Sequence, residues 1–82
     1  GDLSPELRDT FLEAVEQFSS SVPGNQERKD SIKNSLTRMV MKSSPTNDEV
    51  TRLIGGLIDA TTSLQYTTND ENWKKNRRRR VE

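Results

Sequence analysis

Residues 46–64 read TNDEVTRLIGGLIDATTSL, and they carry the strongest helix signal in this chain. Thr46 and Glu49 have the spacing of a capping box, in which each side chain satisfies a backbone donor of the other residue. The apolar residues that follow recur at intervals of three and four, as on one face of a helix; they are Val50, Leu53, Ile54, Leu57, Ile58 and Leu64. We predict a helix over about 47–66. Because its apolar arc is the widest in the chain, we expect it to be the central helix, in contact with two others.

Two shorter helices are predicted before it. Ser4 can cap a helix over about 5–20, whose apolar residues also recur at helical spacing. A second helix is expected over about 26–42, where the apolar stripe is short and begins late. The predicted fold class is therefore all-α, a small three-helix bundle.

The bundle is predicted to occupy residues 1–66. A basic C-terminal tail, helical or disordered, is expected over 67–82.

The composition excludes several functions. The chain has 82 residues, of which 28% are hydrophobic, so it forms one small domain near the lower limit for a stable core. It has no cysteine and no histidine, which excludes disulfides, zinc fingers and nucleophiles that need a histidine base. No apolar run is long enough to cross a membrane. We expect a protein that is not an enzyme, with no cofactor, no metal and no membrane partner.

Charge is unevenly distributed. The formal net charge is 0, yet residues 73–82 hold six cations and one carboxylate, a net charge of +5 that leaves −5 on residues 1–72. The candidate residues of the basic segment are Trp73, Lys74, Lys75, Arg77, Arg78, Arg79 and Arg80. Three interpretations stay open: a nuclear-import signal read by a carrier protein, contact with RNA or DNA through phosphates and base stacking, or a solvated tail.

Other residues are candidates for binding a protein partner. Inside a helix, each glycine of Gly55-Gly56 costs up to ~1 kcal/mol relative to alanine, so the pair needs a reason. A close helix crossing is the favoured explanation, and a groove floor or hinge that admits a partner helix is the other. Met41 lies about 140° from the centre of its helix's apolar face, where an exposed methionine suits an adaptable binding surface. Tyr66, with Trp73, either anchors a partner or covers the end of the bundle. The predicted partner-binding residues are Met39, Met41, Gly55, Gly56 and Tyr66.

The main functional hypothesis is a non-catalytic protein-interaction module of a larger regulatory protein. It would bind a helical peptide or a second copy of itself on the side formed by the second and third predicted helices. The basic tail would act as a nuclear-import signal or an electrostatic anchor, so we expect an intracellular protein, and a nuclear one if the import interpretation holds. The alternative is an RNA- or DNA-binding domain, or an oligomerisation domain, that uses the basic C-terminal segment. A purely structural dimer or tetramer is a third possibility.

Overall fold

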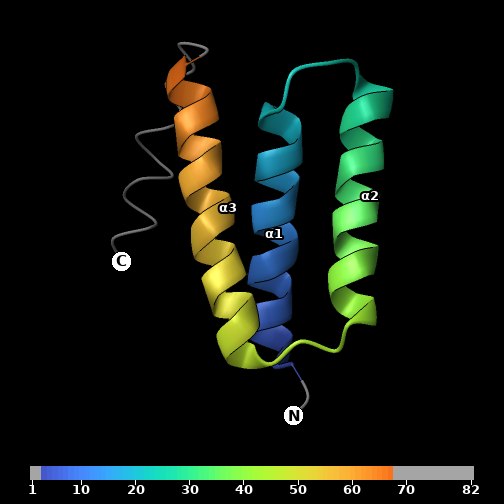
Figure 1. The fold of residues 1–82 in the computed structure, drawn as a ribbon, viewed down its shortest axis with the longest axis vertical. Helices are drawn as coiled ribbons and strands as arrows, with labels where there is room; N and C mark the ends of the chain where they lie inside the picture. Colours follow the sequence, from blue (N-terminus) through green and yellow to red (C-terminus); the bar gives the residue numbers. More distant parts are fainter. Residues whose placement is uncertain (1–2, 68–82) are drawn as a thin grey trace.

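The computed structural model describes residues 3–67, which form three α-helices joined by short loops (Figure 1). They are α1 (Pro5–Ser21), α2 (Gln26–Lys42) and α3 (Asn47–Thr67). These bounds confirm the all-α three-helix prediction to within one residue at each helix end. The predictions for the basic segment beyond Thr67 lie outside the described residues.

Local sequence sets where each helix begins. The Ser4 hydroxyl accepts a hydrogen bond from the Leu7 backbone N–H at 3.2 Å, and the Asn25 side chain caps α2 in the same way. At the start of α3, the Glu49 N–H donates to the Thr46 hydroxyl at 3.1 Å, while the Thr46 N–H donates to the Glu49 carboxylate at 2.9 Å. The predicted capping box is therefore confirmed.

The central helix is α1. It packs against both neighbours, whereas no Cα atom of α2 lies within 8 Å of a Cα atom of α3. Figure 1 shows α1 between the other two, running parallel to α3 and antiparallel to α2. The expectation that the third helix is central was wrong, because a wide apolar arc does not require a neighbour on each side. The apolar face of α1 is narrower than that of α3. However, α1 buries two small residues, Ala14 and Ser19, about 140° apart around its axis, so two helices can approach it closely.

The core lies mainly between α1 and α3. Phe11, Val15 and Val50 are each at most 1% exposed, and Ala14 and Ile54 complete the buried cluster. Within α2, all of which is described, no residue is buried. α2 instead adds partly buried side chains to this cluster, namely Leu36, Val40 and Met41. The helices thus form an open layer in which α2 is held on one side only.

Candidate protein-binding surface

Met39 on α2 and Leu53 on α3 are large apolar side chains exposed to solvent. Met39 is 69% exposed and Leu53 is 42% exposed. Met39 directly precedes Val40, and Leu53 directly precedes Ile54; Val40 and Ile54 both belong to the packed core. α2 and α3 lie on opposite sides of α1 and run in opposite directions (Figure 1). Met39, one residue before Val40, and Leu53, one residue before Ile54, therefore turn to the same face of the layer. We call this side the α2–α3 face.

The α2–α3 face is apolar along much of its length. Leu57 and Leu64 lie within about 40° of Leu53 around α3 and are partly buried. On α2, Ile32 and Leu36 are partly buried on the flank that also carries Met39. The face is left open because α2 and α3 make no close backbone approach to each other.

The glycine pair does not serve a close helix crossing at Gly56. Gly56 is exposed, and a Cβ atom placed there would meet no atom of another residue within 4 Å. The favoured packing explanation is therefore wrong for this residue. Gly56 follows Leu53 by three positions and so lies beside it at the edge of the α2–α3 face. Gly55 is half-buried on the other flank of α3, so the two glycines do not form one site.

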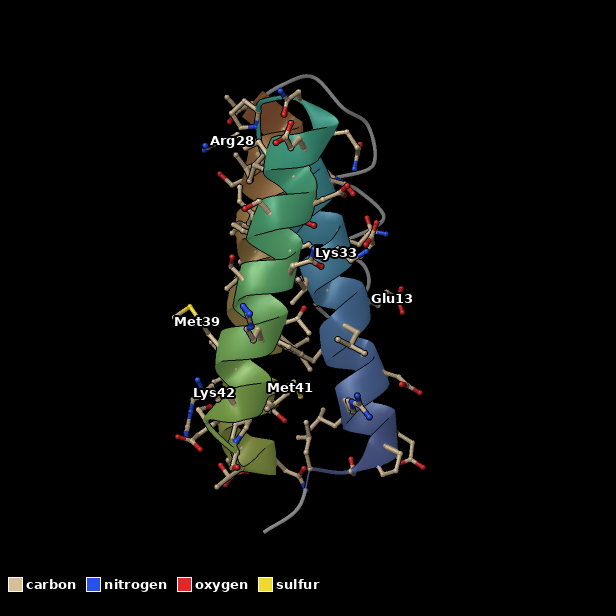
Figure 2. The ribbon with its side chains drawn as sticks, turned by 90° about the vertical axis from the view of Figure 1, so that its right-hand side faces the viewer. Glu13, Arg28, Lys33, Met39, Met41 and Lys42 are labelled. Atoms are coloured by element: carbon tan, nitrogen blue, oxygen red, sulfur yellow. The ribbon has the colours of Figure 1, made fainter. Side chains whose placement is uncertain are left out.

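The position of Met41 on its helix predicted an exposed side chain, and the structure differs. Met41 is partly buried and packs against the core cluster, so that prediction was wrong. Figure 2 shows Met41 and Met39 pointing to different sides of α2. The physical reason is that α2 faces α1 through the flank that carries Lys33, which turns Met41 toward the core and Met39 toward solvent.

Tyr66 lies apart from the α2–α3 face. It is 66% exposed, but thirteen residues separate it from Leu53. That separation corresponds to about 20 Å along α3 and about 220° around its axis. Its suggested companion, Trp73, lies outside the described residues, as do the other candidates of the basic segment.

Three cations of α2 hold the helix in place. Lys33 forms an ion pair with Glu16 of α1 at 2.7 Å. The hydrogen bond to Glu16, and then its negative charge, raise the pKa of Lys33 above its ordinary value. Lys29 donates to a backbone carbonyl of α1, and Arg28 donates to one in the loop between α1 and α2, both at 3.1 Å.

The other two cations of α2 lie beside the methionines. Arg38, Met39, Met41 and Lys42 line a shallow, open depression at the last turn of α2. Arg38 and Lys42 are exposed, and neither forms an ion pair with another residue of the described range 3–67. This depression adjoins the α2–α3 face and places two positive charges next to flexible apolar side chains.

The described part of the chain was also compared with the requirements of a metal site and of a membrane-spanning helix. Residues 3–67 contain no group of three or more carboxylates placed to hold a metal ion. No helix among them is long and apolar enough to cross a membrane. Comparison of the chain with protein-family models, curated proteins and solved structures found no significant match.

Proposed function

We propose that this chain is a non-catalytic protein-interaction module that binds a partner helix on the α2–α3 face. The observation that carries the proposal is the joint exposure of Met39 and Leu53 on one face that no helix of the described range 3–67 covers. A helix laid between α2 and α3 would cover both side chains and add a fourth member to the open layer.

The energetics favour this mode of binding. Full burial of a fully exposed large apolar side chain is worth about 1.5–3 kcal/mol, and Met39 and Leu53 gain the share of it that their exposed 69% and 42% represent. Methionine has three flexible torsions and adapts to a partner's shape. A partner would present apolar side chains at positions i, i+3 or i+4, and i+7, which is the recurrent pattern of helix recognition by an apolar face.

The proposal is tested with a designed amphipathic peptide that carries one leucine stripe, and with a scrambled peptide of the same composition. Binding to the full chain is followed by NMR chemical-shift changes of the backbone amides. We expect shifts along the α2–α3 face, and about a tenfold or larger loss of affinity in a Met39→Glu/Leu53→Glu variant. Tyr66→Glu is the control, because Tyr66 is exposed on another side.

Both variants change exposed residues, so circular dichroism should show an intact fold in each. Equal binding by the scrambled peptide, or shifts confined to the outer side of α1, would contradict the proposal.

Binding of RNA or DNA would have to rely on residues 73–80. Glu16 is paired with Lys33 of α2, but the described outer side of α1 still carries three exposed carboxylates at spacings of three and four, namely Glu6, Asp9 and Glu13. They repel phosphates at low salt. This observation places nucleic-acid binding second among the proposals for this chain.

A further inference from the structure

We propose that the partner helix is acidic on one flank, so that its carboxylates reach Arg38 and Lys42 while an apolar side chain lies on Met39. This inference rests on the proposed function and specifies the chemistry of the partner. It follows from the two cations of the depression at the last turn of α2, Arg38 and Lys42, neither of which forms an ion pair with another residue of the described range 3–67.

Three of the five cations of α2 bind groups within the described residues, and the other two support an acidic partner. Lys33 and Lys29 bind groups of α1, and Arg28 binds a loop carbonyl. Arg38 and Lys42 lie one turn apart on the same side of α2, where like charges repel each other. A carboxylate placed between them relieves this repulsion and gains charge-assisted hydrogen bonds.

A second copy of the chain fits this depression less well. If two copies met through their depressions, Arg38 and Lys42 of one would face Arg38 and Lys42 of the other, and these like charges repel. The carboxylates of α1 lie elsewhere, since Figure 2 shows Glu13 pointing to the side opposite Met39. The outer side of α1 carries these carboxylates but lacks an apolar stripe that could cover Met39 and Leu53.

The chain's own basic segment does not fit either. Residues 73–82 carry a net charge of +5 and would be repelled by Arg38 and Lys42. Apart from Trp73 and Val81 they have no large apolar residue to lie on the α2–α3 face. The acidic, amphipathic helix of another protein remains as the occupant that matches both the charge and the apolar surface.

The test compares two designed peptides with the same leucine stripe, one flanked by glutamates and the other by lysines. Each carries a fluorophore and is titrated with the full 82-residue chain by anisotropy at low and moderate salt. We expect the glutamate-flanked peptide to bind more tightly, and Lys42→Glu to weaken it about five- to tenfold while strengthening the lysine-flanked peptide.

Arg52→Glu is the charge-matched control. Arg52 is exposed and lies two positions before Ile54, on the side of α3 turned away from α1. It should change the affinity by less than about twofold, because it alters the net charge equally without touching the depression. The basic segment is present in every variant, so its attraction for the acidic peptide cancels in this comparison.

The outcomes separate the two proposals. Equal binding of both peptides, lost in the Met39→Glu/Leu53→Glu variant, would overturn the acidic partner and leave the proposed function standing. Equal weakening by Lys42→Glu and Arg52→Glu would show a general charge effect and also overturn the acidic partner. Failure of both peptides to bind would overturn the proposed function and this inference with it.

Discussion

Replacement of Gly56 by alanine is expected to stabilise this protein. Gly56 lies inside α3, is exposed, and has open space where a Cβ atom would be added. Alanine is favoured over glycine in a helix interior by about 0.8–1 kcal/mol, largely because it restricts the unfolded chain. No clash subtracts from that gain, so the free energy of unfolding should rise by about 1 kcal/mol.

The assay is urea and thermal unfolding followed by circular dichroism. For a domain of this size the expected gain corresponds to a rise in Tm of about 4–8 °C, with the urea slope unchanged. Gly24→Ala is the matched control and should destabilise the fold. Gly24 has a φ of +125°, which alanine rarely adopts, and an added Cβ would lie 2.5 Å from the Cδ atom of Arg28.

An unchanged or lowered stability of the Gly56→Ala variant would refute this reasoning. It would mean that a neighbour contacts this side of α3 and needs the missing side-chain volume. Repeating the measurement over a range of protein concentrations would then show whether that neighbour is a second copy, because only self-association makes the midpoint depend on concentration.

Two further predictions concern the capping box and the methionines. Thr46→Ala should cost about 1 kcal/mol of unfolding free energy through loss of the α3 cap. Hydrogen bonds from Thr46 lower the pKa of Glu49 below its ordinary 4.5, so the stability that the ionised Glu49 carboxylate adds is complete above that value and is lost as pH falls through the lower pKa of the folded state. A Glu49→Gln variant should therefore lose less stability than the wild type between neutral and acidic pH, and identical acid dependence would contradict the assignment. Met41→Ala should cost about 1–3 kcal/mol in urea unfolding, whereas Met39→Ala should stay within about 0.5 kcal/mol, and equal costs would show that the two placements are wrong.

The helix bounds could be predicted because they depend on neighbouring residues. The Thr46 and Glu49 side chains bind each other's backbone whatever the rest of the chain does, and Ser4 caps α1 independently of α3. The order of packing could not be predicted in this way. Whether the wide apolar arc of α3 is covered on both sides depends on where α2 lies, which is why Leu53 stays 42% exposed although it belongs to that arc.

In the candidate site too, features that depend on packing could not be predicted from the sequence. Met39 was expected to take part in binding, and its exposure supports the proposed function. The burial of Met41 was missed, because a helix with a single neighbour can turn any flank toward it. The Lys33–Glu16 ion pair holds the flank of α2 that faces α1. This pair could not be predicted from the sequence, because it depends on how α1 packs on α2. Residues 73–80 remain a prediction from charge alone.

The absence of buried residues in α2 separates fold maintenance from recognition. Exposed positions usually tolerate substitution within about 0.5 kcal/mol, so most of the α2 sequence can change while the α1–α3 core persists. What α2 must preserve is its length and its partly buried side chains on the core, Leu36, Val40 and Met41. Its 17 residues return the chain to the end of the layer where α3 begins parallel to α1. Substitutions at the exposed positions of α2 would therefore change the proposed binding surface while leaving the fold intact.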